Sequence, residues 1–452
     1  MSIGSIMNKY THTIKNCTLN TGTIFDLATG NFLPGKNGSM ILNGGLFLSN
    51  AITGRQQTFK SSVAIGYATR ALRNYKESDG LFYETELTLQ GIPRIIQLGG
   101  RGAFEDLNPR FESRDLQFFD KTELNIDDLF EAIQQIAIEK KARKKELIRE
   151  TPFMDTDGSF VKAFVPTIIL CDSFSAASST KEIAMYSDNT VGDSKTNMAN
   201  MNDGRVKTEF ARQIPQICGA CGIYFISTAH IGNNNNLDPF SAPTKDLPMM
   251  SAKDKLKNVG TQYSFLSTNM IQTRKVELLQ DKDKHCQYPS ERNTSDVELQ
   301  KITSFVTRCK NNVSGASFDH VSSQFDGLQE FLDYYLLIKD SKSALLEGTQ
   351  TQKLGITDHE FTRRNLRKVI DEDYTFRRAL EILGQFVFIR NRWNIEHVKA
   401  MGYVDFCKKF NASKTLKAEM LNSTGVWNFN DAKQDRKYMS ILDIIEQISL
   451  KK

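Results

Sequence analysis

Polar residues end four short apolar runs in the first 230 positions of the chain. The runs lie at 46–48, 80–83, 165–171 and 223–227, and amphipathic segments separate them. Strands that alternate with helical segments are typical of a largely parallel sheet flanked by helices. Ligands of such sheets bind outside the carboxyl ends of the strands. We therefore expect an α/β fold in which the polar residues after these runs meet at one crevice.

The same pattern divides the chain into three regions. Residues 1–40 are polar and rich in turn signals, which predicts a short N-terminal arm. Residues 41–330 carry the strand–helix alternation and include a long helix expected over 126–150. Residues 331–452 have helical periodicity and predict a smaller, mainly helical C-terminal region. Helices near and within it are expected at 329–339, 358–371, 375–388 and 439–450.

Two polar segments, 178–203 and 232–260, interrupt the middle region. The first is rich in Ser, Thr, Asn and Gly, and the second contains consecutive asparagines at 233–236. Structureless connections of this length are uncommon in compact domains and are usually functional or disordered. We expect both segments to be mobile loops that carry part of the function.

Composition and charge narrow the function only slightly. Lys and Arg number 58 against 53 Asp and Glu, so the net charge is +5. This balance allows nucleic-acid binding without requiring it, and a basic binding surface would have to be local.

Seven dispersed cysteines fit a reducing compartment. The chain lacks a run of about 18 apolar residues and the apolar core of a signal peptide. We expect a protein without a membrane partner, located in the cytoplasm or, for a viral protein, in the host cytoplasm or a phage replication compartment.

The segment from Gly54 to Ser61 approximates a phosphate-binding loop. The standard loop reads G-x-x-x-x-G-K-[ST]; Gly54, Lys60 and Ser61 match it, whereas Phe59 replaces the second glycine. Backbone N–H groups at a helix N-terminus bind phosphate oxygens, and the Lys and Ser of the motif reach the β- and γ-phosphates and Mg²⁺. On this motif alone, an ordinary strand–turn–helix is an equal alternative. The residues expected to contact the nucleotide are Gly54, Arg55, Gln56, Gln57, Thr58, Phe59, Lys60, Ser61, Ser62 and Asp172.

Two carboxylates at other strand ends strengthen the nucleotide hypothesis. Asp172 directly follows the apolar run 165–171 and can hold Mg²⁺ together with Ser61. Glu86 follows the run 80–83 and can serve as the general base that activates a water molecule. Each carboxylate alone is more typical of a residue that caps a strand or helix. Together with the loop, they predict a site for ATP and Mg²⁺.

These segments resemble the phage UvsX branch of the RecA recombinases. That branch has Phe at the glycine position of its phosphate loop, as the segment 45–71 has here. Residues 81–86 resemble the family's strand that ends in the catalytic glutamate, which corresponds to Glu86. The resemblance covers about residues 40–330 and implies a RecA-like P-loop ATPase core with a mostly parallel central sheet flanked by helices.

Two further strands carry the same resemblance. Residues 168–173 are similar to the strand whose terminal aspartate binds magnesium, which corresponds to Asp172. Residues 226–230 are similar to the strand that senses the γ-phosphate, and the phage branch has histidine at the position of His230. The family comparison therefore implies that His230 reads the nucleotide state.

The resemblance also implies a catalytic contact between subunits. Residues 307–312, followed by Phe318, are similar to the segment that reaches the neighbouring subunit's ATP. Lys310 matches its first cationic position, whereas Asn312 stands where the family has a second Lys or Arg. The catalytic residues that follow are Lys60, Glu86, His230 and Lys310.

The two polar segments fall where the family has its DNA-binding loops. His230 immediately precedes the second segment, which places the nucleotide sensor at the base of a DNA-binding loop. Basic residues there can contact phosphates without reading base sequence, and the alternative is that they only keep the loops soluble. The residues expected to bind DNA are Lys195, Arg205, Lys245, Lys253, Lys255 and Lys257.

The resemblance implies an ATP-dependent DNA recombinase. Such a protein forms a helical filament on single-stranded DNA and pairs it with homologous double-stranded DNA during recombination, repair or replication. Its cofactors would be ATP and Mg²⁺, and single-strand-binding and loader proteins would be its partners. Two alternatives share this core: a ring helicase, and a nucleotide-gated DNA-binding scaffold that has lost hydrolysis.

Overall fold

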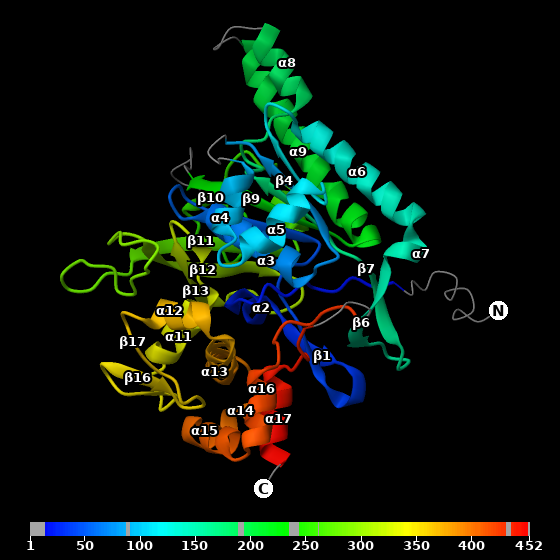
Figure 1. The fold of residues 1–452 in the computed structure, drawn as a ribbon. Helices are drawn as coiled ribbons and strands as arrows, with labels where there is room; N and C mark the ends of the chain where they lie inside the picture. Colours follow the sequence, from blue (N-terminus) through cyan, green and yellow to red (C-terminus); the bar gives the residue numbers. More distant parts are fainter. Residues whose placement is uncertain are drawn as a thin grey trace.

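A computed structural model describes residues 14–86, 91–188, 194–234, 244–260, 262–430 and 435–450, with side chains outside 186–202 (Figure 1). The described residues build a ten-stranded mixed sheet. Its adjacent parallel strands are, in order, β11 (Asn269–Leu278), β3 (Ser49–Gly54), β9 (Ile223–Asn233), β8 (Thr167–Asp172), β4 (Asp79–Glu84) and β5 (Leu116–Asp120). The antiparallel strands are β12 (Leu299–Cys309), β13 (Ser317–Ser323) and β14 (Gly327–Leu328) beyond β11, and β10 (Asp254–Leu256) against β9. The expected large, mostly parallel sheet flanked by helices is confirmed.

Alternating residues of the central strands enter two different hydrophobic cores. In β8, Ile168 and Leu170 belong to one core, whereas Ile169 and Cys171 belong to the other. Successive side chains of a strand point to opposite faces, so a continuous apolar run fills both cores at once. The first face is covered by α3 (Lys60–Asn74), α4 (Ile92–Leu98) and α5 (Ala103–Glu112), and the second by α6 (Ile126–Ala142), α9 (Ser194–Cys221) and α10 (Tyr263–Leu266).

The helix expected over 126–150 begins at Ile126 but ends early. After α6 and the short α7 (Lys144–Leu147), the chain forms β6 (Ile148–Met154), which pairs with β7 (Phe160–Phe164). Pro152 lies in β6, and a proline disfavours helical geometry in the residue before it. The expected helix is therefore interrupted at Arg143 and wrong for residues 148–150, which begin β6.

The loop expected over 178–203 is also wrong for most of its length. Helix α8 (Thr180–Asp188) and the first part of α9 occupy it, and only 189–193 lie outside the described residues. Polar residues lower helix propensity by only a few tenths of a kcal/mol each. Farther along α9, buried side chains including Phe210 and Ile214 anchor the helix in the second core, so the helical turns before them extend an existing helix.

The segment 232–260 is partly a β-hairpin. Strand β9 continues to Asn233, and β10 returns antiparallel to it, with Lys255 opposite Gly232. Residues 235–243, which lie between the two strands in the sequence, are outside the described residues.

The described part of the expected N-terminal arm is folded into the body. Its elements are α2 (Ile24–Thr29), β1 (Asn31–Pro34), the 3₁₀ turn η2 (Lys36–Gly38) and β2 (Met40–Asn43). The side chain of Thr23 caps α2, and every residue of that helix is buried. Phe25 stacks on Tyr67 of α3 at a ring separation of 4.4 Å.

The C-terminal region continues the first core instead of forming one of its own. The helices expected at 329–339, 375–388 and 439–450 are present as α11 (Glu330–Asp340), α13 (Tyr374–Arg392) and α17 (Ile441–Leu450). The helix expected at 358–371 divides into β17 (Glu360–Thr362) and α12 (Leu366–Glu372). The remaining elements are β15 (Leu346–Glu347), β16 (Thr351–Leu354), α14 (Glu396–Ala400), α15 (Tyr403–Asn411) and α16 (Lys414–Leu421).

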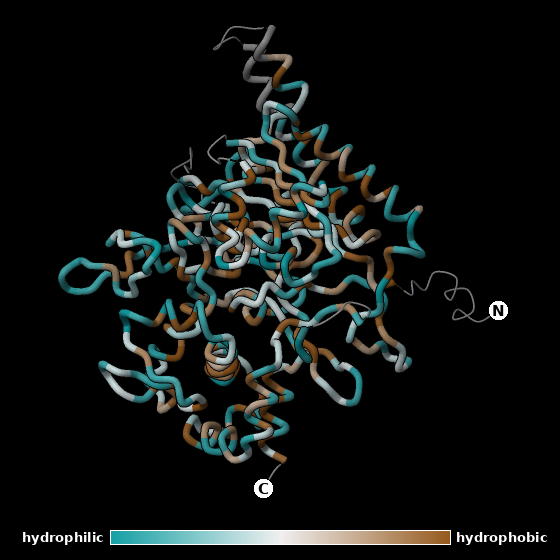
Figure 2. The backbone as a smooth tube through the Cα atoms, in the orientation of Figure 1, coloured by the Kyte–Doolittle hydropathy of each residue, from teal (hydrophilic) through white to brown (hydrophobic). Residues whose placement is uncertain are grey.

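Hydropathy along the chain follows this arrangement. Figure 2 shows α13 as largely hydrophobic, in agreement with its burial, and the connection between β11 and β12 as a mostly hydrophilic projection. In the part of the chain that the structure describes, no helix combines the length and the apolar character needed to cross a bilayer.

Candidate functional site

The loop between β3 and α3 begins at Gly54, where a larger residue would force its neighbours to move. A Cβ on Gly54 would lie 2.2 Å from Oγ1 of Thr273 and 2.4 Å from Oγ1 of Thr58. The Thr58 hydroxyl donates to the Arg55 carbonyl at 2.8 Å and accepts from the Thr273 hydroxyl at 2.7 Å. These bonds hold the loop against the neighbouring strand β11.

Phe59 adopts the backbone conformation that glycine usually supplies. Its φ is 58° and its ψ is 30°, in the left-handed region, and Gln57 has a φ of 59°. This conformation costs an L-residue about 1–2 kcal/mol, which explains why glycine is usual at this position of a phosphate loop. The partly buried Phe59 ring packs against the first core and offsets part of the cost. The departure from the standard motif therefore keeps, at position 59, the left-handed backbone that glycine would supply.

Lys60 is held between this loop and two carboxylates. Its Nζ donates to the Arg55 carbonyl at 3.0 Å, and the residue is only 7% exposed. Burial lowers the pKa of the Lys60 ammonium, and the charges of Glu86 and Asp172 act in the opposite direction. A cation so placed lies where a group with negative charge would be stabilised.

Asp172 is a buried carboxylate at the end of β8. It accepts hydrogen bonds from the Thr228 hydroxyl, at 2.5 Å, and from the Ser61 hydroxyl. Burial raises the pKa of Asp172, and the negative charges of Glu86 and Glu84 raise it further. A bound cation would relieve this unfavourable charge. Mg²⁺ prefers oxygen ligands of this kind, so the Ser61 and Asp172 side chains fit it.

Glu86 and His230 form a direct pair across two strand ends. Nε2 of His230 lies 2.6 Å from Oε1 of Glu86, and both side chains are about one-third exposed (29% and 31%). The hydrogen bond from His230 lowers the pKa of Glu86, more than burial raises it. Glu86 is therefore ionised at neutral pH, as a general base must be.

The β9–β10 hairpin begins beside this pair and is tied to the β3–α3 loop. The Arg55 guanidinium donates to Asn233 at 3.0 Å and to Asp254 at 2.9 Å. Asp254 also accepts from the Gln272 amide at 2.8 Å. The base of the hairpin is thus fixed to the loop that precedes Lys60.

Three exposed lysines share one face of the hairpin. They alternate with buried residues along β10, as the two-residue period of a strand requires. We call Lys253, Lys255 and Lys257 the hairpin lysines. Lys245 and, on α9, Arg205 are exposed as well, whereas the side chain of Lys195 lies outside the described residues.

Lys310 is not part of this cluster within one chain. It follows β12, whose residue Cys309 pairs with Asn269 near the start of β11. The start of β11 lies beside the start of β3, whereas Gly54 at the end of β3 pairs with Thr273. Lys310 therefore lies at the opposite edge of the sheet from the other expected site residues.

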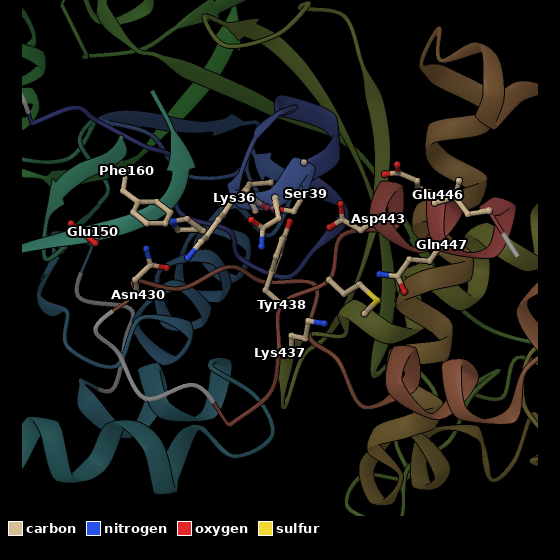
Figure 3. A pocket seen from close by; sticks show the side chains of 16 residues that line it. Lys36, Ser39, Glu150, Phe160, Asn430, Lys437, Tyr438, Asp443, Glu446 and Gln447 are labelled. Carbon is tan, nitrogen blue, oxygen red and sulfur yellow. The ribbon is translucent and has the colours of Figure 1, made fainter. Parts of the chain in front are cut away.

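A cavity of about 720 Å³ lies apart from these strand ends (Figure 3). It is lined by η2, by β6 and β7, and by α17 with the residues before it. Lys36 and Lys437 line it together with the carboxylates Glu150 and Glu446. None of its lining residues is among those that the sequence singled out, and their mixed charges favour no one class of ligand.

Sequence reasoning missed three contacts of the site: Thr228 with Asp172, Arg55 with Asp254, and a serine, Ser175, that joins His230 to the hairpin. Thr228 had a signal, because it lies two residues before His230 on the same strand. Arg55 and Asp254 are 199 positions apart, and no signal in the sequence connects them.

The chain matches no family model, and no curated protein matches it either.

Proposed function

We propose that this chain is an ATP-dependent DNA recombinase with a RecA-like P-loop core. The proposal rests on one observation above all: neighbouring parallel strands, in the order β3, β9, β8, β4, bring to one edge of the sheet the side chains that the proposal assigns to nucleotide binding and hydrolysis. That set consists of Lys60 and Ser61 after β3, His230 in β9, Asp172 at the end of β8, and Glu86 after β4.

Each side chain has a role that its environment supports. Lys60 and the N–H groups of the β3–α3 loop would hold the phosphates of ATP. Ser61 and Asp172 would hold Mg²⁺, which neutralises phosphate charge when bound. Glu86, kept ionised by its bond to His230, would accept a proton from the attacking water.

The hairpin favours single-stranded DNA as the partner. The hairpin lysines form an exposed basic stripe along β10. The base of the hairpin is bonded to the backbone of His230 and, through Asn233 and Asp254, to the β3–α3 loop. Contacts to phosphates position a strand without reading its sequence, which suits a protein that leaves sequence recognition to base pairing. Lys310, at the far edge of the sheet, would serve the nucleotide of a neighbouring copy in a filament.

Nucleotide binding is tested by titrating ATP and Mg²⁺ against wild type and Lys60→Ala. The variant loses the charge that meets the phosphates, so we expect its ATP affinity to fall below detection. The control is Lys76→Ala, which removes a lysine that is 67% exposed just beyond α3 and should leave binding unchanged. Wild-type affinity in folded Lys60→Ala would refute the assignment.

Electron microscopy on single-stranded DNA with a non-hydrolysable ATP analogue separates the proposal from its rivals. Open helical filaments support a recombinase, and a strand-exchange assay on homologous duplexes then completes the test. Closed rings would identify the ring helicase. Nucleotide-dependent DNA binding without ATP hydrolysis would identify the scaffold.

A further inference from the structure

Ser175 bonds to three parts of the chain: β9, the end of the β9–β10 hairpin, and α9. It lies three residues after Asp172 and is 6% exposed. Its hydroxyl accepts from the backbone N–H of His230 at 2.9 Å and donates to the carbonyl of Lys257 at 3.0 Å. One hydroxyl therefore uses both its donor and its acceptor capacity across the base of the β9–β10 hairpin.

The backbone of the same residue reaches α9. The Ser175 carbonyl accepts from Nζ of Lys207 at 3.4 Å, and Lys207 pairs with Asp203 at 2.8 Å. Lys207 is 1% exposed, and a buried ammonium is stable only when its partners are in place. Asp203 ends the first segment that the sequence associates with DNA, so both such segments connect to Ser175.

We propose that Ser175 is the positioning residue that couples the Glu86–His230 pair to the two DNA-binding segments. It touches neither of the reacting side chains and acts through the backbone of His230. The backbone N–H of Lys257 also donates directly to the His230 carbonyl at 3.0 Å, so the hydroxyl adds a second connection between these two residues. When His230 changes its partner, both connections carry the shift of its backbone to Lys257, and the Ser175 carbonyl links the same movement to Lys207 of α9. This inference rests on the proposed function and adds the route by which the nucleotide state reaches DNA.

The test measures single-stranded DNA affinity in the presence of ATP and of ADP, and takes the ratio. Typical coupling free energies correspond to a ratio of roughly 5–150. Ser175→Ala should keep ATP affinity within about threefold of wild type, because the β3–α3 loop supplies it, while the ratio falls toward one. Ser175→Cys fills nearly the same space with a weak hydrogen-bonding group and should lose the ratio too, even if the alanine variant fails to fold.

Ser227→Ala is the matched control. Ser227 is a buried serine on the same strand as His230, and its hydroxyl bonds to Tyr263 at 2.7 Å instead of to the hairpin. It should keep the wild-type ratio. In a double-mutant cycle, Ser175→Ala combined with His230→Ala should lose no more coupling than His230→Ala alone, since both act on one route.

Three outcomes would overturn the inference. A wild-type ratio in both Ser175 variants means that the hydroxyl carries no coupling, while the proposed function stands. Equal losses in Ser227→Ala mean that any destabilised buried serine has this effect. Wild-type protein that binds DNA equally with ATP and ADP refutes the coupling and the proposed function together, and ATP titration of the wild type shows whether nucleotide binding itself survives.

Discussion

Nε2 of His230 lies 2.6 Å from Oε1 of Glu86, so the expected sensor of the γ-phosphate and the expected general base are bonded to each other. A single imidazole nitrogen makes one strong hydrogen bond at a time. Under the proposed function, a phosphate that takes this nitrogen must release Glu86. Sensing and catalysis would then be two states of one side-chain pair, and the Glu86 carboxylate would be free to bind water only when nucleotide is present.

Replacing Glu86 by Gln tests the role of the carboxylate. Glutamine keeps the size and the capacity to accept from His230 but cannot accept a proton from water. ATP affinity should stay near that of wild type, while hydrolysis falls by about 10²–10⁴-fold. Single-turnover hydrolysis after measured ATP loading checks this. Asp120→Asn, which removes another carboxylate at the end of the neighbouring strand β5, should leave the rate unchanged; equal losses in both variants would argue against a specific base.

The same pair predicts a dependence of stability on acid. The hydrogen bond from His230 lowers the pKa of Glu86 from its usual 4.5, so folding favours the ionised carboxylate. The stabilisation is fully present above about pH 4.5 and is lost as the pH falls through the lower folded-state pKa. In urea unfolding between pH 3 and pH 7, the free energy of unfolding should decline less toward acid for Glu86→Gln than for wild type. Parallel curves of this free energy against pH would mean that the Glu86–His230 pair does not contribute to stability.

The sequence predicted where the site lies better than how its parts are joined. The ends of β4 and β8 were predictable, because each apolar run stops at a polar residue and parallel strands end at one edge. The run at 46–48 instead precedes β3, and β9 continues beyond its apolar run to Asn233. The helical state of 180–188 was not, because its packing partners lie outside the segment. The Arg55–Asp254 ion pair was not predictable either, because it depends on how β9 turns back into β10.

Substitutions at Phe59 test the explanation of the altered motif. Phe59→Gly removes a left-handed strain of about 1–2 kcal/mol and loses partial packing of similar size, so ATP affinity and stability should change little. Phe59→Val places a β-branched residue at a φ of 58°, which is far less favourable, and should weaken ATP binding by about tenfold or more. Calorimetric titration of ATP into both variants measures these affinities. Equal affinities for Gly and Val would mean that the loop does not need this conformation.

Asp172 should oppose stability while serving function. Its carboxylate is buried, and both its burial and the nearby charges of Glu86 and Glu84 raise its pKa. Asp172→Asn removes the charge and keeps an oxygen that can accept from Thr228. The ligand-free protein should become more stable by about 0.5–2 kcal/mol, whereas the Mg²⁺-dependent part of ATP affinity should disappear. Thermal unfolding without Mg²⁺ and ATP titration with and without it measure the two effects, and a loss of stability would show that the charge is needed for folding.

The hairpin lysines should account for most of the salt dependence of DNA binding. Each phosphate neutralised on a single strand contributes about −0.7 to the slope of log affinity against log salt. Replacing all three by Ala should therefore reduce the magnitude of the slope by about 2, with no change in base preference, in fluorescence anisotropy titrations on two unrelated oligonucleotides. The matched control replaces three other exposed lysines, at the end of α6 and in α7: Lys141, Lys144 and Lys145. If the control lowers the slope and the hairpin variant does not, the strand runs along α7 and the hairpin is not the DNA-binding element.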